Sequence, residues 1–257
     1  MPISQTAQQN HDRLFPGRTS TLAQTDPELV EVFDNFAFDE VLRHGDLDAR
    51  TRLMTQLAAL IAAGAVNEFR VMLGAALNVG VTPVEAKEIV YQAVPYVGMG
   101  IVFDVLHATN DVLIERGVEL PLPGQSTTSP ETRAERGLVV QKQIVGEDRV
   151  DGLYATAPDD EQHIQRFLSA NCFGDYLTRG GIDVPTRELL TLAMLVALGG
   201  ADAQVKGHVA ANLNVGNDRT RLIEVLTQLI PFIGYPRTLN GLRAVDDVAP
   251  APAQPSS

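Results

Sequence analysis

Cysteine and tryptophan are scarce in this sequence, which has one cysteine, Cys172, and no tryptophan. A single thiol cannot form an internal disulfide, and no CxxC motif is present, so a disulfide framework and a dithiol redox centre are excluded. A multi-cysteine zinc site is excluded for the same reason. The five histidines form no HxH or HExxH pair, so the sequence offers no metal-ligand set.

Long apolar runs are also missing. The longest, such as "LLTLAMLVALGG", span about twelve residues, whereas a transmembrane helix needs about twenty. The N-terminal residues contain no apolar core of the kind found in secretory signals. A formal charge of −12 disfavours binding to nucleic acid or to anionic membranes. These features predict a cytoplasmic protein with no nucleic-acid or membrane partner.

Motifs for cofactor binding and nucleophilic catalysis are absent as well. The chain has no P-loop, no GxSxG motif, and no GxGxxG motif with a suitably spaced acidic residue. We therefore expect no cofactor. Any catalysis would rest on proton transfer and on electrostatic stabilisation of developing charge.

The sequence does contain an internal repeat. The segment Phe38–Ala65 aligns with Phe173–Ala201. After one extra residue in the second copy, "LNVG" at Leu77–Gly80 aligns with "LNVG" at Leu213–Gly216. A register that holds over about seventy residues with one insertion indicates a tandem duplication.

Composition divides the chain around this repeat. Residues 121–133 hold three prolines and small polar residues, as a linker does, and they separate repeats at 25–120 and 134–248. Residues 1–24 are polar and mixed and are expected to form an arm. The tail at 249–257 is rich in proline, alanine and serine and is expected to be disordered.

Both repeats are expected to be helical. Residues 51–64 and 186–200 are apolar nearly all round, which is typical of buried helices. Asp48 and Asp183 are predicted N-caps, and "TPVE" from Thr82 has the pattern of a capping box. The glycine of each "LNVG" suits the end of a helix, where a left-handed conformation is common. No segment alternates apolar and polar residues as a half-buried strand would.

His208 is the histidine with the most informative surroundings. Val209, Ala210 and Ala211 follow it, so its imidazole is expected to be partly buried. Such an imidazole suits proton transfer near neutral pH, although the same pattern fits a core histidine with satisfied hydrogen bonds.

The second repeat resembles the carboxymuconolactone decarboxylase family, in the superfamily of alkyl hydroperoxide reductase D-like proteins. The resemblance rests on the order and spacing of "RGLVVQKQIVGEDRVDG", "FGDYLTRGGIDVPTRELLTLAMLVALGG", "HVAANLNVG" and "IPFIGYPRTLNGL". The first repeat matches only the later part of this pattern. The resemblance implies an all-α fold, with two tandem decarboxylase-like domains packed as a pseudo-dimer, and assembly into trimeric or hexameric rings.

The family's namesake reaction removes carbon dioxide from a lactone without a cofactor. Loss of carbon dioxide leaves negative charge that is delocalised into a conjugated carbonyl, so the site must stabilise that charge and then protonate carbon. By its position, His208 would be the proton-transfer residue. Arg179 and Arg187 match two family arginines and would hold a carboxylate or enolate, with a solvated charge at a helix start as the alternative for Arg187.

Several positions depart from the family pattern and leave the substrate open. Gln204 stands where decarboxylases of the family have a glutamate, and Phe232 stands where they have a tyrosine. Phe173 and Leu177 replace two tryptophans. We expect Gln204, Phe232 and Tyr235 to bind substrate together with Arg187.

The first repeat lacks the histidine, because Met72 occupies the position of His208. It keeps a carboxylate, since Glu68 occupies the position of Gln204. One hypothesis is that Glu68 and His208 contribute to one shared catalytic pocket. The alternative is that the first repeat is a scaffold and Glu68 a surface charge.

Three functions remain open at this point. The first is a cofactor-free lyase or isomerase that acts on a small carboxylated lactone or enolisable acid. The second is a non-catalytic member of the family that binds a ligand or supports assembly. A peroxidase function is disfavoured, because the cysteine positions of that branch are occupied by Ala201 and Gln204, and Cys172 is expected to be an inert core thiol.

Two fused repeats per chain predict an assembly with half the usual number of chains, and we favour a homotrimer of pseudo-dimers. Three chains of 27.7 kDa would give a particle of about 83 kDa in multi-angle light scattering. A monodisperse monomer would contradict this prediction.

Overall fold

Every regular element in the computed structural model is a helix, and the structure describes residues 2–252. The first repeat contains α2 (Pro27–Asn35), η2 (Phe36–Glu40), η3 (Val41–Arg43), α3 (Ala49–Ala62), α4 (Val66–Asn78), α5 (Pro83–Val97) and α6 (Met99–Glu115). The second contains α7 (Arg133–Val145), α8 (Glu147–Thr156), α9 (Gln162–Phe167), η4 (Leu168–Leu177), α10 (Val184–Leu198), α11 (Asp202–Asn214), α12 (Arg219–Ile233) and α13 (Tyr235–Val248). This confirms the all-α prediction.

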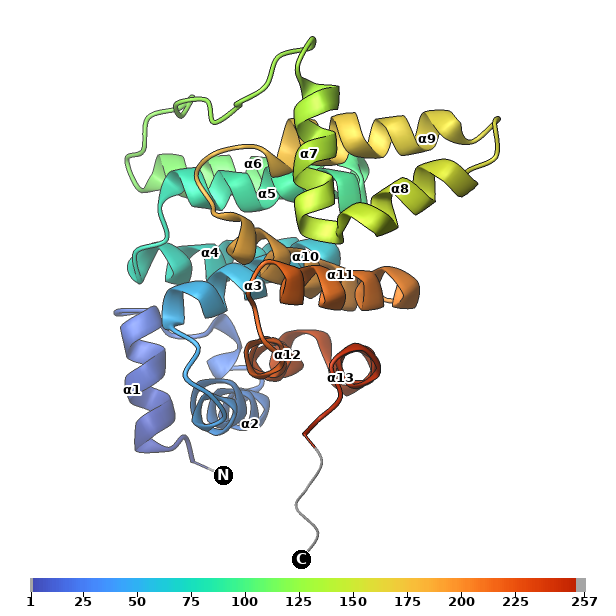
Figure 1. The fold of residues 1–257 in the computed structure, drawn as a ribbon. Helices are drawn as coiled ribbons and strands as arrows, with labels where there is room; N and C mark the ends of the chain where they lie inside the picture. Colours follow the sequence, from blue (N-terminus) through green and yellow to red (C-terminus); the bar gives the residue numbers. More distant parts are fainter. Residues whose placement is uncertain (1, 253–257) are drawn as a thin grey trace, which may run out of the picture.

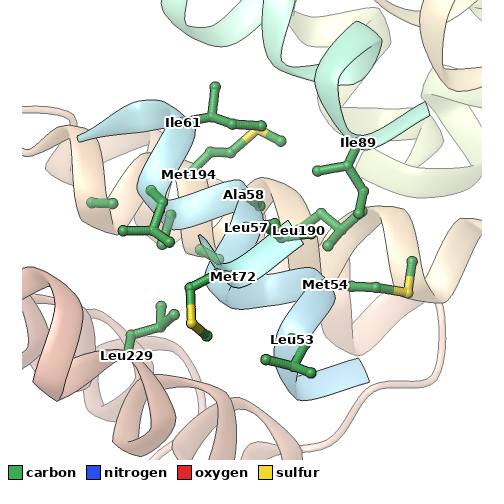
Figure 2. Packing of buried hydrophobic residues seen from close by; sticks show 14 of the residues in the cluster. Leu53, Met54, Leu57, Ala58, Ile61, Met72, Ile89, Leu190, Met194 and Leu229 are labelled. Carbon is green, nitrogen blue, oxygen red and sulfur yellow. The ribbon is translucent and has the colours of Figure 1, made fainter. Parts of the chain in front are cut away.

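The two helices that were predicted to be buried, α3 and α10, pack against each other at the centre of the molecule (Figure 1). Leu57 and Ile61 on α3 lie beside Leu190 and Met194 on α10 in the core, and Leu53 belongs to the same buried cluster (Figure 2). All five side chains are at most 2% exposed. Because both helices are apolar nearly all round, other helices must cover their remaining faces.

Each repeat contributes one covering helix to the other. Helix α5 of the first repeat packs against α10 and η4 of the second, and α12 of the second packs against α3, η2 and η3 of the first. Two glutamines at equivalent positions anchor this exchange. Gln92 donates to the carbonyl of Arg187 at 2.8 Å, and Gln228 donates to the carbonyl of Val41 at 2.7 Å. The two repeats therefore share one core.

Helix ends follow the local sequence signals. Asp48 and Asp183 each accept a hydrogen bond from a first-turn backbone amide, at 2.9 and 2.8 Å. Thr82 forms the predicted capping box with N3 of its helix. Gly80 and Gly216 end the two "LNVG" segments with φ of 93° and 97°, in the left-handed region where other residues are strained. All of these end signals are confirmed.

The segment that was expected to be a polar arm contains a helix docked on the first repeat. Helix α1 (Gln5–Leu14) buries Ala7 and Leu14, and Ser4 caps its N-terminus. A short turn, η1 (Thr21–Ala23), follows it. Asn10 donates to the carbonyl of Phe38 at 2.8 Å, which ties the arm to η2. The polar composition concealed this docking because only a few apolar side chains make it.

The region predicted as the linker connects α6 to α7 without a helix. It is held against the second repeat, because the carbonyl of Gln125 accepts from the amide of Gly180 at 2.9 Å, and Thr127 donates to the carbonyl of Thr178 at 2.8 Å. The predicted disordered tail begins after α13, and its residues 253–257 lie outside the described part of the chain. Among the described helices, none has the length and apolar character needed to cross a bilayer.

A buried ionic cluster joins the repeats at the exchanged helix α5. Glu88 accepts from both Nε and Nη2 of Arg179, at 3.0 and 2.9 Å, and from Nη2 of Arg187 at 3.0 Å. Arg187 also donates to Gln92 and to the carbonyls of Arg179 and Gly180. Burial lowers the pKa of Arg187, and Glu88 counteracts that shift. A guanidinium at 0% exposure is kept charged by such partners.

Loss of Glu88 should therefore destabilise the fold strongly. We expect Glu88→Ala to lower the free energy of unfolding by about 3–5 kcal/mol, because it leaves buried cations without a counter-charge. Urea denaturation followed by circular dichroism would measure the loss.

Glu224 offers a matched control, because it occupies the position of Glu88 in the second repeat. It accepts from the backbone amide of Asp46 at 2.9 Å and lies 3.8 Å from Arg221. We expect Glu224→Ala to cost only about 1 kcal/mol, the value of one hydrogen bond. Equal losses in the two variants would contradict the structural role of the cluster.

Candidate functional site

His208 and Glu188 form a pair where α11 crosses α10. Nδ1 of His208 lies 2.8 Å from Oε2 of Glu188. The Glu188 side chain is 0% exposed and that of His208 is 17% exposed, so the carboxylate lies inside and the imidazole at the edge of the core. A carboxylate that accepts from Nδ1 fixes both the orientation and the tautomer of the ring.

Asn212 holds the backbone of this pair in place. Its side-chain amide donates to the carbonyl of His208 at 2.7 Å, one turn earlier on the same helix, and to the carbonyl of Glu188 at 3.1 Å. Asn217 donates to the Asn212 side-chain oxygen at 2.9 Å, which fixes the orientation of its amide. The two helices are thus joined by hydrogen bonds at the level of the pair.

The second ring nitrogen, Nε2, makes no hydrogen bond within the described residues. Oε1 of Glu188 is also buried without a hydrogen-bond partner there. With Nδ1 occupied by Glu188, Nε2 is the atom that can accept a proton from, or donate a proton to, a bound molecule. This arrangement is suited to general acid–base chemistry.

Tyr96 reaches this pair from the first repeat, on the exchanged helix α5. Its ring lies edge-on to the His208 imidazole, with centroids 5.9 Å apart and an interplanar angle of 78°. Desolvation raises the pKa of Tyr96 well above its usual value, and the nearby Cys172 and Glu188 add to the shift, while a hydrogen bond with Thr191 opposes it. The hydroxyl therefore stays protonated and can donate a hydrogen bond.

Helices α5 and α12 each pack against the other repeat, so matching positions within the second repeat alone could not identify every residue near His208. Phe232 is the residue of the second repeat at the position of Tyr96, and its helix α12 packs against the first repeat instead. Phe232 lies with Glu68 on the wall of a cavity in the first repeat. The replacement of tyrosine by phenylalanine at position 232 thus concerns the first-repeat cavity, and Tyr96 lies at His208.

The hypothesis of one pocket shared by Glu68 and His208 finds no support in the cavities. Glu68 lines the first-repeat cavity, and His208 lines neither of the two cavities described. The carboxylate beside His208 belongs to Glu188, from the same repeat.

The predicted arginines lie in the ionic cluster around Glu88. Arg187 has no exposed surface, so its contacts favour a structural role. Arg179 lines the other cavity, beneath the linker, and lies 5.2 Å from the centroid of the Tyr91 ring. Of the remaining predicted residues, Gln204 is exposed one turn before His208, and Tyr235 is exposed at the start of α13 beside Phe36.

Three residues near His208 escaped the sequence analysis. Glu188 could have been noticed as a lone acid within an apolar helix, where a buried charge needs a partner. Tyr96 could not, because its contact depends on the exchange of α5. The third is Arg149 on α8, whose guanidinium lies over Gly207, since a Cβ atom there would be 3.2 Å from Nη2. Arg149 forms no ion pair within the described residues.

Comparison with known proteins identifies the family. The model of the carboxymuconolactone decarboxylase family matches residues 27–111 and again residues 162–247, together more than half of the chain. The chain belongs to this family. The double match also confirms the tandem duplication.

Among carboxymuconolactone decarboxylase relatives, the chain is similar to a 4-carboxymuconolactone decarboxylase of Acinetobacter baylyi. The two are 30% identical over 118 residues, which cover 46% of this chain and 87% of the relative. The relative therefore aligns with less than half of this chain, as expected when this chain contains two copies of the family domain.

The thiol of Cys172 is predicted to be inert. Burial raises the pKa of Cys172 from 9.0 to about 12, although a hydrogen bond with Tyr96 opposes the shift. At pH 8 the thiolate fraction should be about a thousandfold below that of a free cysteine, because the shift spans about three units. Labelling with a chromogenic disulfide should be correspondingly slow in the native protein and fast in urea. Rapid native labelling would contradict the burial of this thiol.

Proposed function

We propose that this protein is a cofactor-free carbon–carbon lyase that decarboxylates a small carboxylated lactone or a related enolisable acid. The observation that carries the proposal is the Glu188–His208 pair, with Nε2 of the imidazole unoccupied. Family membership and the similarity to a 4-carboxymuconolactone decarboxylase support the reaction class.

The proposed reaction needs one bond cleavage and one proton transfer. The bond between carbon and the departing carboxylate breaks, carbon dioxide leaves, and the electron pair stays on the substrate as an enolate delocalised into the conjugated carbonyl. A proton on Nε2 of His208 then passes to carbon, and the imidazole regains a proton from solvent. Glu188 balances the charge of the imidazolium and keeps Nε2 directed outward.

Tyr96 is proposed to stabilise the enolate or to orient the substrate. Its desolvated hydroxyl remains protonated, because its pKa is raised, and it would exchange its present partner, Thr191 or Cys172, for a substrate oxygen. A donor directed at developing negative charge is most effective where water is excluded.

Arg149 is proposed to hold the substrate carboxylate or carbonyl. Its position over Gly207 and its lack of an acidic partner support this role. Arg179, which the family resemblance suggested, already has its Nε–Nη2 edge engaged by Glu88 in an ion pair. An arginine that is free of acidic partners binds a carboxylate without first breaking an ion pair.

A second candidate is a family member that binds a ligand without turning it over. It is favoured by the exposed Gln204, where decarboxylases of the family carry a glutamate, and by the absence of His208 from the walls of both cavities. Under this reading, the Glu188–His208 pair would join α10 and α11 without taking part in chemistry.

Removal of the imidazole should separate the two candidates. We expect His208→Ala to lower kcat for carbon dioxide release from lactone acids by about a hundredfold or more, since general acid–base groups contribute about 10²–10⁴. A coupled carbon dioxide assay with a panel of lactone and β-keto acids would measure the rate.

The exposed His107 on α6 provides a matched control, and His107→Ala should retain the wild-type rate. Circular dichroism would establish that both variants are folded. Full activity in His208→Ala, or no turnover of any acid by the wild-type protein, would refute the proposed lyase and favour the binding role.

A further inference from the structure

The cavity of the first repeat is a built pocket that the proposed lyase does not use. Its volume is about 420 Å³, which is within the range of small-molecule sites. Residues of α1, η1, α2, α4 and α12 line it, so the N-terminal arm closes one side and the exchanged helix another. In Figure 1, α1, α2 and α12 lie toward the end of the molecule that carries the N-terminus, and α4 lies above them.

Aromatic rings form a connected wall in this pocket. The Phe33 ring lies edge-on to Phe38 at 6.0 Å and to Phe232 at 5.9 Å. The Phe15 and His11 rings continue the same network, at 5.9 and 5.6 Å from Phe38. Ring faces in such walls attract cations through their quadrupoles.

Two carboxylates in the pocket lack partners. Asp34 is 9% exposed, and neither Asp34 nor Glu68 makes a hydrogen bond or ion pair within the described residues. Burial raises the pKa of Asp34, with His11 opposing the shift, and burial likewise raises the pKa of Glu68, with Arg18 opposing it. Both shifts mean that the anionic forms are insufficiently compensated by the protein alone.

The charged side chains on the cavity wall indicate whether a cationic or an anionic ligand would bind there. Arg18 is the single permanent cation on the wall, against the two carboxylates. An ammonium group would supply the missing positive charge and donors to Asp34, and its apolar body would contact the phenylalanine rings. An anion would meet Arg18 but would also face both acids.

We propose that the first-repeat cavity binds a small organic cation, an amine with an apolar or aromatic body. Met72 stands in the first repeat where the second has His208, so the proton-transfer histidine of the proposed lyase has no counterpart at that position. The two repeats would then carry different sites, with Glu188–His208 in one and the acidic aromatic pocket in the other.

Isothermal titration calorimetry on the full chain tests the proposal with three probes of one shape: phenethylamine, 2-phenylethanol and 3-phenylpropionate. We expect the amine to bind at least about tenfold more tightly than the alcohol, and the carboxylate to bind most weakly, because a charged hydrogen bond adds to the shared apolar contacts. A preference for the carboxylate, equal affinities, or no binding of the amine would overturn the proposal.

Near-isosteric variants locate the binding. Asp34→Asn and Glu68→Gln should each weaken amine binding by about tenfold and leave alcohol binding within about twofold. Glu115→Gln, at an exposed acid on α6, should change neither affinity. Amine binding that survives the double variant would place the amine elsewhere and refute this site.

His208→Ala separates this proposal from the proposed lyase. Amine affinity should be unchanged in that variant, whereas lyase activity should be lost. Failure of the amine to bind with lyase activity intact would refute the cation site alone, and lack of lyase activity with amine binding intact would refute the lyase alone. If a pocket variant fails to fold, the ranking of the three probes on the wild-type chain still decides.

Discussion

Two helices that are apolar on nearly every side must be covered on every side, and this requirement determines how the repeats are joined. Helices α3 and α10 cover one face of each other, and the exchanged helices α5 and α12 cover others. The ion cluster around Glu88 and the hydrogen bonds of Gln92 and Gln228 fix the exchanged helices in register. Each repeat is incomplete without the other, because part of its core belongs to its neighbour.

This exchange also determines the composition of both sites. The second repeat supplies Glu188 and His208, and the first supplies the Tyr96 ring beside them. In the other direction, Phe232 from the second repeat forms part of the cavity that contains Glu68. A residue-by-residue comparison within a single repeat therefore combines side chains that belong to two different sites, the one at His208 and the first-repeat cavity.

Local features of the fold could be predicted from the sequence, because their causes are local. The caps at Asp48, Asp183 and Thr82 depend on one side chain and the next few amides, and the buried helices depend on composition alone. His208 was identified correctly as partly buried. The partner of its Nδ1 was missed, because α10 and α11 are brought together by tertiary packing that no spacing rule describes.

Charged residues were the hardest to place. The sequence around Arg187 is the same whether this residue binds a substrate or forms a buried ion pair. Only the position of Glu88, on a helix of the other repeat, distinguishes the two roles. The docked helix within the N-terminal arm was not predicted, because the arm is polar on average and its docking depends on a few residues such as Ala7 and Leu14. Both cases show a few long-range contacts outweighing the average character of a segment.

The covalent connection of the two repeats has a consequence for how the protein can change over time. In a symmetric dimer of separate chains, one substitution alters both sites at once, so neither can lose a catalytic group without the other losing it too. Here Met72 and His208 are independent positions in one chain. Selection can therefore act on each site separately, while the shared core obliges both repeats to keep the same helices.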